Sequence, residues 1–247
     1  MTSQSVLHNF RVVLCQTSHP GNIGSAARAM KTMGLQHLYL VKPDSFPDAH
    51  ATALATGAAD LLEKAVVCET LDEALTGCAF AIGLSARKRQ LSHELVSVRT
   101  AATQAIETAA TQPVALVFGT EMSGLSNAEL DRCQMLAMIP ANPEYSSLNL
   151  AAAVQIMCYE LRMTALENAP LSPNKAIEYA TIDSIEGFYT HLEETLLHIG
   201  YLNPAAPKKL MERIRRIYAR IRLEKEEVNL LRGILTLTIN PRKHDKY

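Results

Sequence analysis

The first two-thirds of the chain alternates short apolar runs with segments whose apolar residues recur every three or four positions. The apolar runs end at glycine, proline or polar residues and lie at 11–17, 37–42, 64–68, 80–86, 113–119 and 134–141. Several are almost continuously apolar, which is typical of strands covered on both faces. The helix-like segments lie between them at 23–33, 71–75, 98–110, 127–133 and 148–166. This alternation predicts an α/β fold with a mostly parallel sheet flanked by helices.

The pattern changes after residue 166. Residues 167–183 hold two prolines among polar residues, which favours a linker. Beyond it, 184–199 and 208–221 have helical periodicity, and a third apolar stretch covers 226–240. We therefore predict a first domain at 1–166, a linker at 167–183 and a small helical domain at 184–247.

Composition narrows the class of protein. Of the 247 residues, 48% are hydrophobic and 20% are charged, which indicates a globular chain. No apolar run is long enough to span a membrane, and the first residues have no signal-peptide pattern. The five cysteines are scattered and mostly within apolar stretches, without the spacing of zinc ligands. We expect a cytoplasmic protein with reduced thiols and no metal.

The first candidate site is the glycine-rich loop that follows the run at 11–17. Its Gly21 and Gly24 lack the G-x-G spacing of a dinucleotide fingerprint. A turn with Asn22 or Ser25 capping a helix explains the glycines without any ligand. Arg28, however, is near the start of the predicted helix, where a cation opposes the helix dipole. We therefore expect Arg28 to face an anion.

Two more loops follow predicted strands. In Gly83–Ser92, the Gly-x-Ser start lacks the second glycine of a nucleophile elbow, which argues against a serine hydrolase. Arg87, Lys88 and Arg89 in this loop are either solvated or in contact with phosphate. In Phe118–Leu130, two glycines bracket Glu121, and Ser126 or Asn127 is placed to cap the next helix with Glu129. Tight turns alone would explain those glycines.

The fourth loop, "NPEYSSLNLAAAV" at Asn142–Val154, opens a helix with more polar groups than a cap requires.

Together, "GNIGSAARAM", "VFGTEMSGLS" and "IPANPEYSSLNLAAAV" resemble the three signature motifs of the SPOUT class of RNA methyltransferases. The resemblance extends along almost the whole chain. Within the class, the sequence is most similar to the bacterial tRNA (cytidine/uridine-2′-O-)methyltransferases that act on nucleotide 32 of the anticodon loop. The resemblance implies a trefoil knot at the end of the catalytic domain, which the sequence pattern alone does not predict.

The resemblance also implies a function and a site. The activity is S-adenosylmethionine-dependent 2′-O-methylation of tRNA, with no metal. The donor pocket is formed by Leu84, Ser85, Ala86, Gly119, Ile139, Ser146, Ser147 and Leu148. Glu121 and Asn149 are expected to brace the loops.

Arg28 matches the arginine that the class needs for catalysis, either as general base or as a clamp on the phosphate beside the target ribose. We favour the clamp, because an arginine does not lose its proton in proteins. Arg87 and Arg89 are expected to contact the RNA. The class is homodimeric, with Arg28 completing the partner's site. The apolar residues around much of 23–35 agree with an interface, although burial within one chain also explains them.

The segment Lys208–Arg222 holds seven basic residues and one acidic residue. Leu210, Ile214, Ile217 and Ile221 are expected to form its buried face. Arg213, Arg216 and Arg220 form a second stripe, which is either a solvated helix face or a contact for the tRNA backbone.

Two other functions fit the sequence less well. A nicotinamide-dependent oxidoreductase needs the missing dinucleotide fingerprint, and an RNA-binding module without catalysis needs neither Arg28 nor the serine loop.

Overall fold

The computed structural model describes residues 6–85, 95–167 and 178–241. The chain forms two compact units, one comprising residues up to 176 and the other residues 177–247. Predicted residues Ala86, Arg87 and Arg89 lie outside the described part of the chain.

The first unit is built on a seven-stranded parallel sheet with the order β3-β2-β1-β6-β4-β7-β5. Its strands are β1 (Phe10–Cys15), β2 (His37–Val41), β3 (Val66–Cys68), β4 (Phe80–Leu84), β5 (Leu95–Ser97), β6 (Val114–Phe118) and β7 (Met135–Met138). The apolar runs predicted six of these strands and the parallel arrangement correctly. The central strand β6 is buried along its whole length, as its uninterrupted apolar sequence requires.

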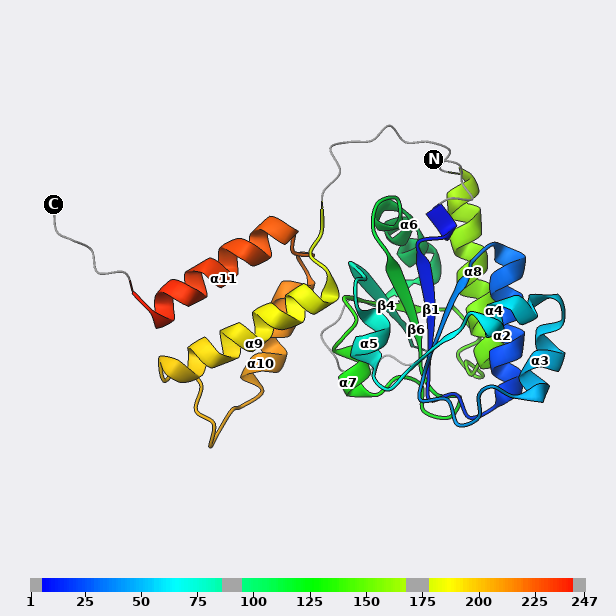
Figure 1. Ribbon diagram of the computed structural model, residues 1–247, viewed down its shortest axis with the longest axis horizontal. Helices are drawn as coiled ribbons and strands as arrows, with labels where there is room; N and C mark the ends of the chain where they lie inside the picture. Colours follow the sequence, from blue (N-terminus) through cyan, green and yellow to red (C-terminus); the bar gives the residue numbers. More distant parts are fainter. Residues whose placement is uncertain (1–5, 86–94, 168–177, 242–247) are drawn as a thin grey trace. The chain divides into compact units, whose positions relative to one another are not determined.

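Helices cover both faces of this sheet (Figure 1). On one face, α2 (Pro20–Met33), α8 (Leu150–Glu167) and α6 (Val98–Ala109) lie side by side, and α3 (Ala49–Ala55) and α4 (Ala59–Glu63) pack against α2, joined by the 3-10 helix η1 (Thr56–Ala58). The shorter helices α5 (Leu71–Leu75) and α7 (Asn127–Leu130) are on the other face, where Arg132 just after α7 pairs with Asp72 of α5. The core therefore has a layer on each side of the sheet, as predicted.

Four elements were not predicted from the sequence: β5, α3, η1 and α4. Strand β5 has only three residues and pairs with β7. Helix α3 is held at its start by Asp48, whose carboxylate accepts hydrogen bonds from the amides of His50 and Ala51. Alanines make up most of α3, so its apolar periodicity is weak.

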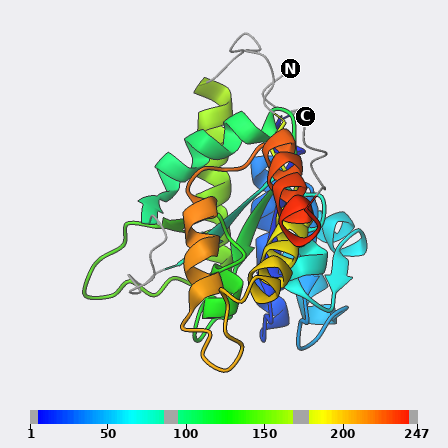
Figure 2. The same cartoon turned by 90° about the vertical axis from the view of Figure 1, so that its left-hand side faces the viewer.

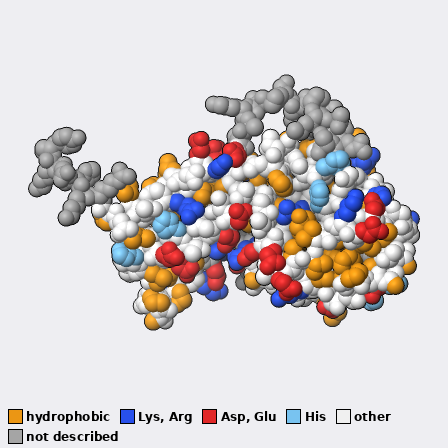
Figure 3. All heavy atoms as spheres, in the orientation of Figure 1, with side chains coloured by type: hydrophobic (Ala, Val, Ile, Leu, Met, Phe, Trp, Pro, Cys, Tyr) orange, Lys and Arg blue, Asp and Glu red, His pale blue; other side chains and the backbone are white. Residues whose placement is uncertain are grey.

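The surface charges are mixed and the thiols lie in the interior. On the face shown in Figure 3, acidic and basic side chains are interspersed. All five cysteines are buried and free, as predicted. None of the helices in the described parts of the chain is long and apolar enough to span a bilayer.

The second unit consists of α9 (Ile182–His198), α10 (Leu210–Ala219) and α11 (Lys225–Ile239), which are coloured yellow to red in Figure 2. Its core is mostly aliphatic and contains an aromatic cluster, in which the Phe188 and Tyr218 rings are 5.0 Å apart in an edge-to-face arrangement. The first two of these helices were predicted from their periodicity, and the third coincides with the apolar stretch at 226–240.

The predicted buried face of α10 is wrong at two of its four positions. Ile217 and Ile221 are each 59% exposed, whereas Met211, Ile214 and Tyr218 pack against the core. Both sets have the three-and-four spacing of a helix face. Tyr218 decides between them, because its ring packs on Phe188 and Tyr189 and turns the helix by about one residue.

Candidate active site

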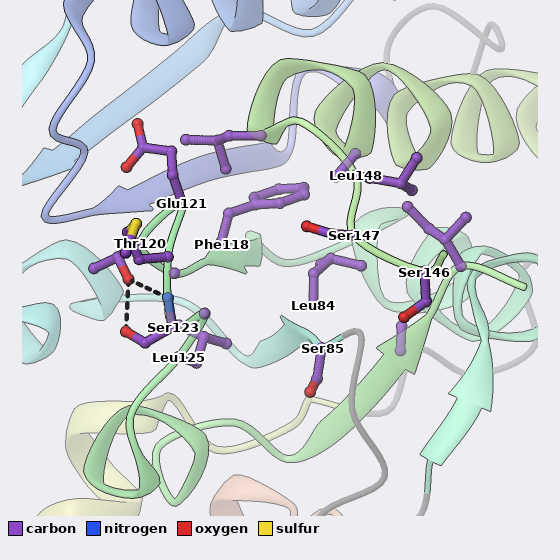
Figure 4. Close-up of a pocket in the computed structure, with 17 residues that line it drawn as sticks. Leu84, Ser85, Phe118, Thr120, Glu121, Ser123, Leu125, Ser146, Ser147 and Leu148 are labelled. Atoms are coloured by element: carbon purple, nitrogen blue, oxygen red, sulfur yellow. Dashed lines mark hydrogen bonds between the residues drawn. The ribbon is translucent and has the colours of Figure 1, made fainter. Parts of the chain in front are cut away.

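A pocket opens at the carboxyl ends of three adjacent strands, β6, β4 and β7 (Figure 4). This is the edge of a parallel sheet where ligands collect. The segment that leads into α8 closes the remaining side. The lining residues are Leu84, Ser85, Phe118 to Leu125, Ala137, Ile139, Ser146, Ser147, Leu148, Leu150 and Ala153. Most of these side chains are small or apolar, and the polar ones are five hydroxyl side chains and the carboxylate of Glu121.

Seven of the eight residues predicted to hold the donor line this one pocket. They are Leu84, Ser85, Gly119, Ile139, Ser146, Ser147 and Leu148. The Ser147 hydroxyl points from its loop toward Phe118 and Leu84 (Figure 4). Residues that are up to 64 positions apart in sequence therefore share one cavity because their strands are neighbours in the sheet.

The loop from Gly119 to Leu125 forms one wall and is tightly folded. A Cβ on Gly119 would lie 2.1 Å from the carbonyl carbon of Gly124, so no side chain fits there. Gly124 has φ +68°, and its amide donates to the Thr120 carbonyl at 3.0 Å. The Thr120 and Ser123 hydroxyls are 2.8 Å apart. Both glycines are thus required by the turn itself, as the sequence analysis allowed.

Glu121 extends from this loop to the start of α2. Its carboxylate accepts hydrogen bonds from the amides of Ser18 and His19, at 3.1 and 3.2 Å, and from the Ser18 hydroxyl at 3.0 Å. It also accepts from Asn22 Nδ2 at 2.9 Å. The prediction that Glu121 braces the loops is confirmed.

The same hydrogen bonds change the acidity of Glu121. Partial burial by itself would raise the pKa of this carboxyl group. The donors from Asn22, Ser18 and His19 outweigh burial, because they stabilise the charged form, and the pKa is lowered. Glu121 is therefore held as a carboxylate.

Asn149 joins the fourth loop to the same network. Its Nδ2 donates to Asn22 Oδ1 at 2.9 Å, and its Oδ1 accepts from the amides of Ala151 and Ala152 in the first turn of α8. Asn149, and neither serine, thus caps the helix. This accounts for the surplus of polar groups before α8, since Ser146 and Ser147 line the pocket instead.

The first motif differs from its prediction in two respects. Helix α2 begins at Pro20 with His19 as N-cap, so neither Asn22 nor Ser25 caps it. Arg28 is the ninth residue of this helix and is exposed, two turns from the N-terminus, so the argument from the helix dipole fails. Arg28 is also absent from the residues that line the pocket.

The glycines of the first motif serve helix packing. A Cβ on Gly24 would lie 2.0 Å from the Ala51 carbonyl oxygen of α3, and one on Gly21 would meet His50 and Leu54. Because α2 packs between α3 and α8, its apolar surplus is buried within the chain. The surplus therefore gives no support for a dimer interface.

The chain matches two protein-family models. Residues 9–159 match the model of the SpoU rRNA Methylase family. The chain belongs to the SpoU methylase family. Residues 183–246 match the C-terminal domain of the tRNA methyltransferase TrmJ, so the two matches fall on the two units.

Individual members of the family extend the comparison. A Pseudomonas aeruginosa relative named tRNA (cytidine/uridine/adenosine-2′-O-)-methyltransferase TrmJ is 51% identical, covering 94% of this chain and 95% of its own length. The crystal structure of TrmJ from Z. mobilis superposes with a TM-score of 0.80 at 31% identity, covering 92% of this chain and 97% of that one. The SpoU methyltransferase AviRb from Streptomyces viridochromogenes, solved with the cofactor AdoMet, has a TM-score of 0.52 at 25% identity, covering 65% and 62%.

In this SpoU-family chain the basic residues of the helical unit differ in their surroundings. Arg213 and Arg220 are exposed, and Arg216 is partly buried. Arg215 is bound to Glu186 by two hydrogen bonds of 2.6 and 2.8 Å and lies over the Tyr189 ring. Arg215 therefore stabilises the helical unit. The predicted outward stripe consists of Arg213, Arg216 and Arg220.

Sequence reasoning did not assign every residue that lines the pocket. Phe118 and Leu125 are among those missed, although one ends a strand and the other follows a turn. Asn22 was interpreted as a possible cap and instead joins Glu121 to Asn149. Its place beside a strand-end loop was the only available signal.

Proposed function

We propose that this chain transfers a methyl group from S-adenosylmethionine to the 2′-hydroxyl of cytidine or uridine 32 in the tRNA anticodon loop. The observation that carries the proposal is the meeting of seven expected donor-binding residues in one pocket of a SpoU-family chain. The names of the relatives support the tRNA ribose as acceptor.

The pocket suits a donor of this kind. Apolar walls from Leu84, Phe118 and Ile139 fit a flat heteroaromatic ring, and exposed backbone groups at the strand ends supply hydrogen bonds to its edge. Gly119 allows the loop that forms one wall to fold tightly on itself. The Ser146 and Ser147 hydroxyls are available because Asn149 caps the helix. When bound, S-adenosylmethionine supplies a methyl group activated by its sulfonium.

Transfer forms an oxygen–carbon bond as the carbon–sulfur bond breaks, and the hydroxyl proton must leave. Positioning of the two reactants supplies much of the acceleration. We assign Arg28 to the acceptor, where its guanidinium clamps the phosphate beside the target ribose and lowers the pKa of the hydroxyl. Water or phosphate then takes the proton, because a guanidinium is not a base at neutral pH.

The active species is proposed to be a homodimer in which Arg28 of one subunit serves the pocket of the other. The position of Arg28 on an exposed part of α2, outside its own chain's pocket, supports this division. The trefoil knot at the end of the catalytic unit remains a prediction of the resemblance, as do the contacts of Arg87 and Arg89 with RNA. Arg213, Arg216 and Arg220 of the helical unit are proposed to hold the tRNA backbone.

Calorimetric titration and product mapping test the proposal together. The purified protein should bind S-adenosylmethionine and not NAD, with chelator present throughout. Nuclease digestion of methylated tRNA should leave a resistant dinucleotide that contains nucleotide 32, because a 2′-O-methyl group blocks cleavage. NAD binding without donor binding would favour the oxidoreductase, and RNA binding with neither ligand would favour the binding module.

A further inference from the structure

Two exposed apolar side chains flank the pocket. Among the large hydrophobic residues in the described part of the chain, Met122 at 90% and Tyr145 at 78% are the most exposed. Met122 lines the pocket from the loop after β6, and Tyr145 directly precedes Ser146 in the loop after β7. Because β6 and β7 are the two neighbours of β4 in the sheet, these loops rise on opposite sides of the pocket.

Tyr145 is presented by an ordered turn. Its amide donates to the Asn142 carbonyl at 3.0 Å, and the Glu144 amide donates to Asn142 Oδ1 at 3.1 Å. Pro143 occupies the second position of this turn, where its ring presets φ. The local hydrogen bonds therefore fix the backbone that carries the ring, while the ring itself stays in solvent.

We propose that Tyr145 stacks on the base of the nucleotide being methylated, with Met122 closing the other side. This inference rests on the proposed function. The target ribose must reach the pocket, so its base lies within one nucleotide's length of the rim where Tyr145 stands. Bases in single-stranded loops are unstacked, and proteins bind them on aromatic rings.

Stacking on Tyr145 also allows the site to accept more than one kind of base. A π-face contact does not read the Watson–Crick edge, so pyrimidines and purines are accepted on the same ring. The Pseudomonas aeruginosa relative is named for cytidine, uridine and adenosine. A platform of this kind gives the nucleotide a position without selecting one base.

The test compares Tyr145→Leu with Tyr145→Phe, which keeps the ring. Loss of one stacked base corresponds to about a 5- to 150-fold drop in kcat/KM for tRNA in Tyr145→Leu. We expect the drop mainly in KM, because the stack forms on binding, and expect wild-type behaviour in Tyr145→Phe. The dissociation constant for S-adenosylmethionine should be unchanged in both variants.

A fluorescent cytidine analogue at nucleotide 32 gives a readout independent of turnover. The wild type and Tyr145→Phe should quench it, and Tyr145→Leu should not, while the analogue placed in the tRNA acceptor stem should report no difference.

Undiminished kcat/KM together with full quenching in Tyr145→Leu overturns the proposal. Loss of the dimer in Tyr145→Leu by light scattering also overturns it, since Tyr145 would then contact a second copy. If the wild type transfers no methyl to any tRNA, the proposed function fails, and quenching in the bound complex still decides the stacking.

Discussion

Asn149 Nδ2 donates a hydrogen bond to Asn22 Oδ1 at 2.9 Å, joining residues 127 positions apart in the sequence. Asn22 in turn donates to Glu121, and Asn149 caps α8. One chain of hydrogen bonds thus connects the loops after β1, β6 and β7. The pocket wall, the serine loop and the helix that carries Arg28 are therefore held in one arrangement.

Asn149 has two roles that substitution separates. Asn149→Ala removes both, and loss of the cap should lower the free energy of unfolding by about 1 kcal/mol. Asn149→Ser keeps a capping oxygen and loses only the bond to Asn22, so its stability should stay near that of the wild type. Both variants should bind S-adenosylmethionine more weakly in calorimetry. Wild-type affinity in both would mean that the link to Asn22 does not shape the pocket.

The lowered pKa of Glu121 predicts a pH dependence of stability. Because the folded-state pKa lies below the ordinary value of about 4.3, the carboxylate stabilises the fold fully above that pH. This contribution is lost as the pH falls through the folded-state pKa. Glu121→Gln should therefore melt below the wild type at pH 7, with the difference in Tm shrinking in acid. A difference in Tm that is constant from pH 7 to pH 3 would contradict this assignment.

Arg28 and Ser147 are assigned to opposite sides of the reaction. Arg28→Ala should lower kcat by about 100-fold or more, the usual cost of losing one electrostatic contact to the reacting group. Its fold should be intact, because Arg28 is exposed and alanine favours helix.

Ser147→Ala should weaken S-adenosylmethionine binding by about 2- to 10-fold, the value of one hydrogen bond. Titration of both variants with the donor checks the division, which is wrong if Arg28→Ala loses the donor as severely as Ser147→Ala.

The helical unit's role in RNA binding predicts a change in salt dependence. Replacing Arg213 and Arg220 with Gln should flatten the slope of log affinity against log salt by roughly 0.7 to 0.9 for each phosphate that is no longer neutralised. The control replaces Lys31 and Lys225 with Gln, which removes the same number of positive charges. These two lysines are chosen because each already pairs with an acidic side chain of the protein. Equal slopes for the two double variants would assign the Arg213 stripe to solvent.

The sheet was predictable because its strands are apolar on both faces. Val114–Phe118 has no polar position to confuse with a helix, and its burial is complete. Helix α3 was not predicted, because Gly24 and Ala51 meet through backbone atoms that give no apolar signal in the sequence. Short elements of small residues depend on tertiary contacts rather than on pattern.

The position of the pocket was predictable, and its internal contacts were not. The carboxyl ends of parallel strands converge, so Gly119 and Ser85 were expected to be close before their geometry was known. The partners of Asn22 depend on which side chains two distant loops bring within 3 Å, and spacing carries no such information. On α10, two faces have equal periodicity, and the rings of Phe188 and Tyr218 decide which one is buried.

The central claim is methyl transfer to one ribose oxygen of tRNA, and a single atom tests it. Two otherwise identical tRNAs, one with ribose and one with 2′-deoxyribose at nucleotide 32, are incubated with the protein and methyl-labelled S-adenosylmethionine. We predict one methyl group per molecule on the first tRNA and none on the second. Equal labelling of the two would place the methyl on a base or on another nucleotide and would contradict the assigned reaction.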